Sequence, residues 1–142
     1  MKKAVVLVII LGALYAGYTY VSPPKAKTTQ HTEAKGSAIV DVIVPDTLTP
    51  IEAIGKVAFN AKCASCHGPN AHGQQDVAPP LIHKIYEPNH HGDLAFERAA
   101  ILGVKAHHWP FGNMPAIKGI TQADIKPIIA YVRRLQRENG IL

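Results

Sequence analysis

The sequence contains very little cysteine: Cys63 and Cys66 are the only two in a chain of 142 residues. A structural disulfide normally joins distant parts of a chain, and a bridge across three residues would remove almost no loop entropy. A structural zinc site usually has a second pair of ligands at short spacing, and no second Cys-x-x-Cys occurs. Cysteine is therefore confined to one place, the segment CASCH at residues 63–67.

Aromatic residues are also few, with one Trp, five Tyr and three Phe in the whole chain. A domain of this size buries a small share of its surface, so few large side chains leave it with a thin core. A large apolar cofactor would supply the missing interior. The aromatic residues available beyond residue 48 are Phe59, Tyr86, Phe96, Trp109, Phe111 and Tyr131.

Charge is neither strongly biased nor arranged in runs, since the formal net charge is only +5. Residues 49–142 have a mild excess of Lys and Arg over Asp and Glu, and the two signs are mixed. This pattern excludes a nucleic-acid-binding stripe. It is typical of an ordinary solvated surface, and it is compatible with an acidic docking partner.

A long hydrophobic run is present at the start of the chain, where residues 4–21 carry no charge. As a helix this run would reach about 27 Å, close to the ~30 Å thickness of the hydrocarbon layer. Bulky residues at the −3 positions of the available cleavage sites favour a retained anchor over a cleaved signal peptide. We expect residues 1–21 to be a single-pass anchor, with Lys2 and Lys3 on the cytoplasmic side and the rest of the chain exported.

The remainder divides at about residue 48. Residues 22–48 are rich in proline and polar side chains and predict a periplasmic tether, apart from the β-branched run at 38–44, which predicts a short strand or an apolar strap. Residues 49–142 predict an all-α domain.

Three helices are expected in this domain. The first has Thr49 as its cap and Pro50 at its first position, and it places Ile51, Ile54, Ala58 and Phe59 on one face. The second starts with Asp93 as cap and stops at Gly103. The third starts at Thr121 or, because of Pro127, nearer Asp124, and its apolar face contains Ile125, Ile128, Ile129, Val132 and Leu135.

The segment Cys63-Ala64-Ser65-Cys66-His67 has the Cys-x-x-Cys-His pattern of covalent haem c attachment. On one helical turn, the two thiols can add to the two vinyl groups of one haem while the histidine faces the iron. Two alternatives stay open. One is a thioredoxin-like dithiol, although the surroundings are helical, and the other is zinc or copper with His107 and His108, or His90 and His91, completing the site.

Over residues 49–137 the chain resembles the class I c-type cytochromes. Gly55 and Phe59 are similar to that family's N-terminal helix, where the glycine permits a close crossing with the C-terminal helix and its aromatic residue, here Tyr131. The resemblance implies that the carbonyl of Pro79, in a Pro-x-Leu motif ending at Leu81, accepts a hydrogen bond from the axial His67. It also implies that Met114 is the second axial ligand and that Trp109 points at a haem propionate. Asn113 would either donate to the methionine sulfur or shape the turn.

The resemblance implies an all-α class I cytochrome c fold and one-electron transfer by one covalent haem c, with no enzymatic activity and no small-molecule substrate. Expected partners are a quinol-oxidising complex and a terminal oxidase or reductase, with the haem domain in the periplasm and the anchor in the inner membrane. A permanent subunit of a larger oxidoreductase and a haem-based ligand sensor or peroxidase-like enzyme are the alternatives. The domain has unusually many histidines, and we hypothesise that His107 or His108 replaces Met114 or contacts a propionate, which would make the potential pH-dependent.

Overall fold

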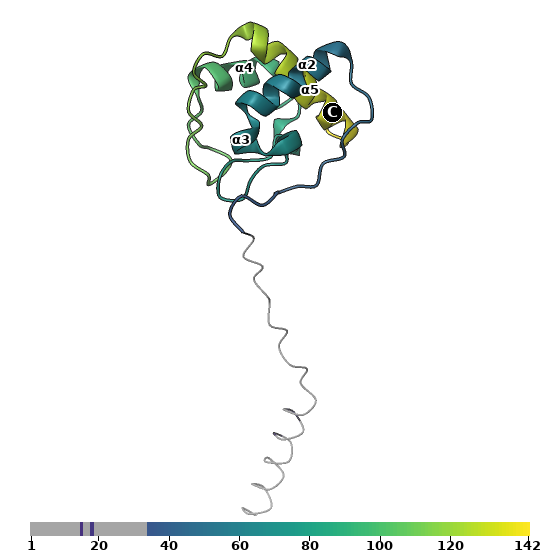
Figure 1. Cartoon of the computed structure of the whole chain (residues 1–142). Helices are drawn as coiled ribbons and strands as arrows, with labels where there is room; N and C mark the ends of the chain where they lie inside the picture. Colours follow the sequence, from purple (N-terminus) through teal and green to yellow (C-terminus); the bar gives the residue numbers. More distant parts are fainter. Residues whose placement is uncertain (1–14, 16–17, 19–33) are drawn as a thin grey trace, which may run out of the picture. The chain divides into compact units, whose positions relative to one another are not determined.

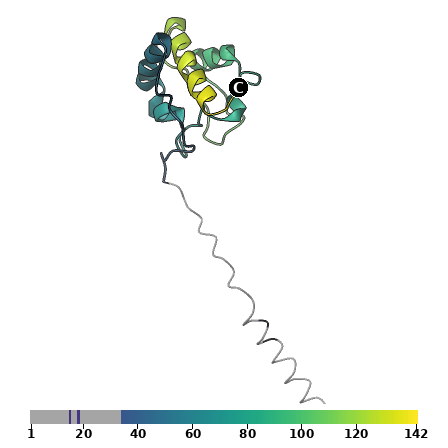
Figure 2. The same ribbon diagram turned by 90° about the vertical axis from the view of Figure 1, so that its right-hand side faces the viewer.

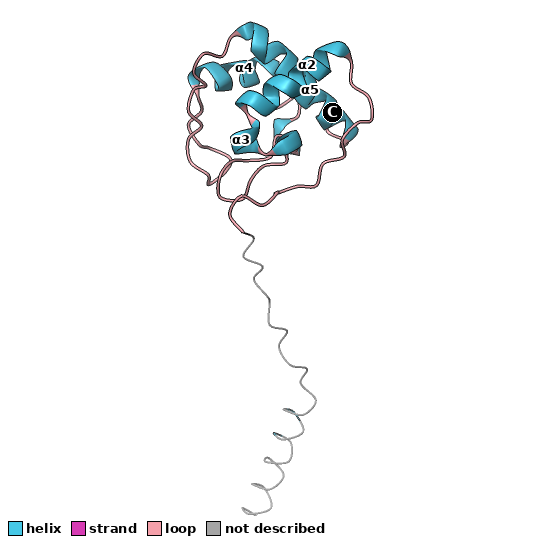
Figure 3. Cartoon of the chain, in the orientation of Figure 1, coloured by secondary structure: helices cyan, strands magenta, loops and turns pink. Residues whose placement is uncertain are grey.

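The computed structural model describes Tyr15, Tyr18 and residues 34–142. Residues 34–142 belong to one structural unit, in which helices are joined by loops (Figure 3). The predicted anchor, apart from Tyr15 and Tyr18, lies outside the described residues. In the part of the chain that is described, none of the helices combines the length and the apolar character that crossing a membrane requires.

The first long helix, α2 (Pro50–Lys62), begins where the sequence predicts, at the cap Thr49. The Thr49 hydroxyl accepts a hydrogen bond from the backbone N–H of Glu52, and the Glu52 carboxylate accepts one from the backbone N–H of Thr49. This reciprocal pair satisfies two backbone donors that a helix start leaves free.

The predicted buried face of α2 is partly wrong. Ile51 and Ile54 are 50% and 60% exposed, and the residues that α2 buries are Glu52, Gly55 and Phe59. The reason is the partner helix α5, which comes closest at the glycine and not at the larger isoleucines. Glu52 is buried at this interface because Arg137 of α5 donates to its carboxylate at 3.2 Å.

The last helix, α5 (Gln122–Glu138), is capped by Thr121, which exchanges hydrogen bonds with Asp124 as Thr49 does with Glu52. Pro127 therefore lies inside the helix, and the alternative start nearer Asp124 is excluded. Pro127 has no N–H to donate to the carbonyl of Ala123, so one helical hydrogen bond is missing. Ala123 is exposed, and water can bind its carbonyl instead. All five isoleucine, valine and leucine residues of the predicted apolar face are buried: Ile125, Ile128, Ile129, Val132 and Leu135.

Helices α2 and α5 lie against each other and form the largest helix–helix contact of the described domain (Figures 1 and 2). A Cβ atom built on Gly55 would lie 1.9 Å from the carbonyl oxygen of Pro127, so only glycine permits this approach. One turn further on, the rings of Phe59 and Tyr131 meet with their centroids 5.8 Å apart. The close crossing predicted from Gly55 and Tyr131 is therefore present.

Two further helices frame the space between these elements. Helix α4 (Asp93–Leu102) ends at Gly103 as predicted, but its cap is Gly92, and Asp93 is its first residue. The Asp93 carboxylate is occupied elsewhere, since it accepts a hydrogen bond from Arg133 at 2.8 Å. The short helix α3 (Ala64–His67) follows α2 directly and contains most of CASCH.

The run at residues 38–44 forms a strap over the domain, one of the two forms that the sequence predicts. Ala38 makes an isolated bridge to Gln74, while Val40 and Val42 pack against the main core cluster. At its far end, the backbone of Ile43 exchanges two hydrogen bonds of 2.8 Å with the side chain of Asn139. Part of the predicted tether therefore packs against the helical domain.

Candidate functional site

An apolar cavity of about 370 Å³ lies within the domain, a size typical of sites for organic ligands and cofactors. Its walls come from helices α2, α4 and α5, from residues 63–82 (the histidine segment), from residues 103–119 (the methionine loop), and from Tyr86, His91 and Ile120. Every site residue predicted from the sequence, except Cys66, lines this cavity: Cys63, His67, Pro79, Leu81, Trp109 and Met114.

His67 is held in one orientation at the cavity wall. Its side chain is almost fully buried, and Nδ1 lies 2.8 Å from the carbonyl oxygen of Pro79. A carbonyl only accepts hydrogen bonds, so Nδ1 carries the proton and Nε2 keeps its lone pair. Burial lowers the pKa of His67, while the bond to Pro79 opposes this change. The imidazole is therefore neutral near pH 7 and able to bind a metal through Nε2.

Two prolines stand side by side here, and the backbone path makes Pro79, not Pro80, the acceptor. The carbonyl of Pro79 meets His67, whereas Pro80 is fully buried. A Cβ atom on Gly73 would lie 2.4 Å from the nitrogen of Pro80, so this glycine allows the proline segment to approach. The next residue, Leu81, donates its N–H to the carbonyl of Ala71 at 2.9 Å, which fixes the segment against the cavity.

The two cysteines do not form a disulfide, and their surroundings differ. Cys63 is half-buried at the cavity wall, and burial, followed by the nearby Cys66, raises the pKa of its thiol to about 11. Cys66 is exposed. The amide of Gln74 donates to the carbonyls of Ser65 and Cys66, at 2.9 Å each, and so holds the turn that carries both thiols.

Met114 lies in the methionine loop, opposite Val104 along a short antiparallel contact. Each backbone N–H donates to the other residue's carbonyl at 2.9 Å. Gly103 has a φ of +77°, and a Cβ atom there would lie 2.6 Å from the Met114 carbonyl. The Asn113 side chain accepts a hydrogen bond from the backbone N–H of Ala106 at 2.9 Å, so in this structure it shapes the loop.

Trp109 provides an unpaired donor. Its indole Nε1 is buried and has no hydrogen-bond partner among the described residues. Burial raises the pKa of the Tyr86 hydroxyl, and the nearby indole of Trp109 partly opposes this effect. The two groups nevertheless do not reach hydrogen-bond geometry. Since buried N–H groups are normally satisfied, this donor indicates that the cavity accepts a ligand with an oxygen acceptor at this point.

These residues fit haem c. Two thiols three residues apart can form thioethers, His67 offers an oriented imidazole nitrogen, and Met114 offers a thioether sulfur at the same cavity. The indole of Trp109 can donate to a propionate, and the lining is otherwise mostly apolar.

Sequence reasoning missed several residues that support this site. Gln74 holds the cysteine turn, and Tyr86 and Phe96 line the cavity. Arg133 is buried and donates to the carbonyl of Tyr86 at 2.7 Å, which anchors one wall. The scarcity of aromatic residues is a signal that could have found Tyr86 and Phe96, whereas a lone Gln or Arg gives no such signal.

Comparison with known proteins agrees with this geometry. The family model described as cytochrome c matches residues 52–136, which is more than half of the chain and contains every predicted site residue. No curated protein matches the sequence. The chain belongs to the cytochrome c family, whose members transfer electrons through covalently bound haem.

Proposed function

We propose that this protein is a one-electron carrier with a single haem c, attached through Cys63 and Cys66 and ligated by His67 and Met114. The observation that carries the proposal is the convergence of an oriented imidazole, a thioether sulfur and a thiol on one apolar cavity. Bound haem supplies the redox chemistry, since its iron alternates between the ferrous and ferric states.

The chain's own residues set the properties of this centre. Pro79 orients His67 and increases its basicity as a ligand, because it accepts the Nδ1 proton. A thioether ligand from Met114 would raise the reduction potential relative to two nitrogen ligands, and the apolar lining would raise it further by disfavouring net charge. We therefore expect a moderately high potential.

With both axial positions filled by side chains, the iron would have no open position for a substrate. This arrangement favours a carrier over an enzyme, because the protein then contributes orientation, potential and a docking edge. Slow binding of CO by the ferrous protein is the expected result. Rapid uptake would instead favour a ligand sensor or a peroxidase-like enzyme.

We place the carrier at the periplasmic face of the inner membrane, held there by residues 1–21. The supports for this are the uncharged run at residues 4–21 and the lysines that precede it. The partners would be a quinol-oxidising complex as donor and a terminal oxidase or reductase as acceptor.

One experiment tests cofactor and anchor together. A pyridine haemochrome assay and an intact-mass measurement on protein purified from membranes should give one haem per chain and the mass of the full polypeptide plus one haem. A colourless protein with two alkylatable thiols would overturn the haem proposal. A mass that lacks residues 1–21 would overturn the anchor but leave the carrier function intact.

A further inference from the structure

Four histidines that are not proposed as haem ligands come together from two separate loops, and three of them, His91, His107 and His108, also line the cavity. His90 and His91 precede helix α4, whereas His107 and His108 lie in the methionine loop. The ring centroids of His90 and His91 are 4.6 Å apart, and those of His91 and His108 are 5.3 Å apart. We call these four residues the histidine cluster.

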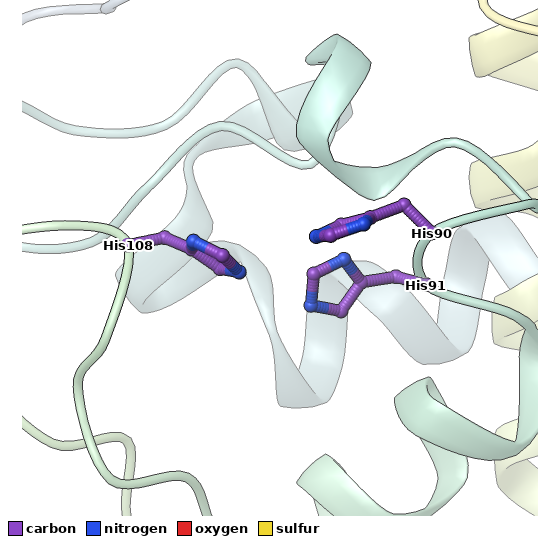
Figure 4. A group of neighbouring side chains, drawn as sticks. All are labelled: His90, His91 and His108. Carbon is purple, nitrogen blue, oxygen red and sulfur yellow. The ribbon is translucent and has the colours of Figure 1, made fainter.

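Three members of the cluster present nitrogen atoms to a common point. One ring nitrogen from each of His90, His91 and His108 lies within 4.8 Å of the others, and Figure 4 shows the three side chains directed toward one another. In a tetrahedral zinc site with Zn–N bonds of about 2.1 Å, ligand nitrogens lie roughly 3.4 Å apart. A small closing movement would therefore produce a three-histidine metal site.

We propose that His90, His91 and His108 bind a divalent transition-metal ion of the class that prefers imidazole nitrogen, such as Zn²⁺ or Cu²⁺. Imidazole suits these ions better than it suits Mg²⁺ or Ca²⁺, which prefer oxygen ligands. The group contains neither cysteine nor His67 or Met114, although His91 and His108 also line the cavity proposed for haem. The site therefore lies at the edge of that cavity, and it differs from the mixed cysteine and histidine site considered from the sequence.

For one of the three proposed ligands, His91, a hydrogen bond already selects the tautomer that metal binding needs, and the neighbouring His107 has a similar bond. Nδ1 of His91 donates to the carbonyl of Ile85 at 2.6 Å, and Nδ1 of His107 donates to the carbonyl of Lys105 at 2.8 Å. In both rings Nε2 then keeps its lone pair for a metal. Such backbone partners are the usual outer contacts of metal-binding histidines. His107 lies beside this group, with its ring centroid 4.1 Å from that of His108, but it is not one of the three residues whose nitrogens converge.

The two loops are fixed at their backbones, while the ligands at their tips can adjust. Arg133, which is buried, donates to the carbonyls of Tyr86 and His91 and is itself paired with Asp93. On the other side, Asn113 holds the backbone of Ala106. The side chains of His90 and His108 are exposed and that of His91 is half-buried. The rings can therefore close on an ion without displacing a packed core.

The test is metal titration of the haem-containing protein, purified without a polyhistidine tag. Attached haem prevents both thiols and His67 from binding the added metal. If the preparation is colourless, the thiols are alkylated before the titration. Failure of the haem proposal can then be told apart from failure of the metal-site proposal. Calorimetry with Zn²⁺ should show one equivalent bound. With Cu²⁺, electron paramagnetic resonance should show a copper signal with splitting from nitrogen ligands.

His90→Gln and His108→Gln should each weaken Zn²⁺ binding by at least about tenfold, since each removes one ligand, and the double variant should abolish it. His72→Gln is the matched control, a histidine outside the cluster, and should bind Zn²⁺ like the wild type. Unchanged absorbance spectra would show that the variants are folded. Absence of Zn²⁺ binding in the wild type, or binding that survives in the double variant, would overturn the proposal.

Discussion

The histidine segment and the methionine loop line the same cavity but are held in different ways. His67 is buried, and its ring is hydrogen-bonded to Pro79. The turn that carries it is clamped by Gln74. Met114 is only half-buried, and its loop is held by the backbone pair with Val104, by the Asn113 side chain and by a backbone bond from Ile117 to Ala100 of α4.

This difference indicates how the fold distributes rigidity around a cofactor. The side that carries both cysteines and His67 continues directly from the α2–α5 crossing, because Cys63 caps the C-terminal end of α2. The side that carries Met114 is a loop with no regular helix of its own, which is joined to α4 by the backbone bond from Ile117 to Ala100. We therefore expect substitutions near the crossing to affect folding, and substitutions in the loop to affect the properties of the iron.

Gly55→Ala should have the largest effect. The new Cβ would lie 1.9 Å from the Pro127 carbonyl oxygen, so α2 and α5 must separate, at a cost of about 3 kcal/mol or more. Guanidinium unfolding of the haem-containing protein measures this cost. Gly112→Ala in the methionine loop is the control. That glycine has a φ of +85° but open space around it, so only backbone strain of about 1–2 kcal/mol is expected. Equal losses of unfolding free energy in the two variants would contradict the proposed difference between the helix crossing and the methionine loop.

The sequence predicts the elements of this fold well because their signals are local. A capping threonine with an acidic residue three positions later marks the starts of both α2 and α5, and helical spacing marks the buried face of α5. The buried face of α2 is mispredicted because a glycine carries no hydrophobic signal, although the neighbouring helix selects it. Asp93 is likewise misassigned as a cap because its partner, Arg133, lies 40 residues away.

The candidate site is predictable where residues are adjacent in sequence, as in CASCH. The hydrogen bond of His67 to Pro79 follows from a family resemblance and not from any local pattern. The histidine cluster shows the limit of sequence reasoning. The sequence shows two histidine pairs, but only the structure brings His90 and His91 near His108.

Met114→Ala should have the next largest effect and should leave the fold intact. In the proposed ligand set, loss of the sulfur would open one ligand position, so the long-wavelength absorbance of a thioether-bound ferric haem should disappear and CO should bind rapidly. The midpoint potential should fall by a sizeable part of the roughly 0.8 V range that axial ligands span. An unchanged spectrum would show that another residue, such as His107 or His108, is the ligand.

Asn113→Ala should produce a smaller change, restricted to the methionine loop. It removes the acceptor for the backbone N–H of Ala106, a bond whose net contribution is about 1 kcal/mol. The loop should open more often, and CO should displace Met114 faster than in the wild type. Asn113→Asp keeps an oxygen at this position and is the matched control, with CO kinetics near those of the wild type. Equal rates in the alanine and aspartate variants would mean that the side chain does not hold the loop.

Trp109→Phe should have the smallest effect and distinguishes a propionate contact from simple packing. Phenylalanine preserves the ring that stacks against Phe111, with centroids 5.8 Å apart in the wild type, but it removes the buried indole donor. If that donor binds a propionate, its loss leaves more negative charge near the iron. This favours the ferric state and should lower the midpoint potential by tens of millivolts, where about 59 mV corresponds to a tenfold change for one electron. Stability should change little, because the ring remains. A midpoint potential equal to that of the wild type would show that Trp109 serves only to fill the cavity wall, and that the methionine loop contributes to the iron's properties through Met114 alone.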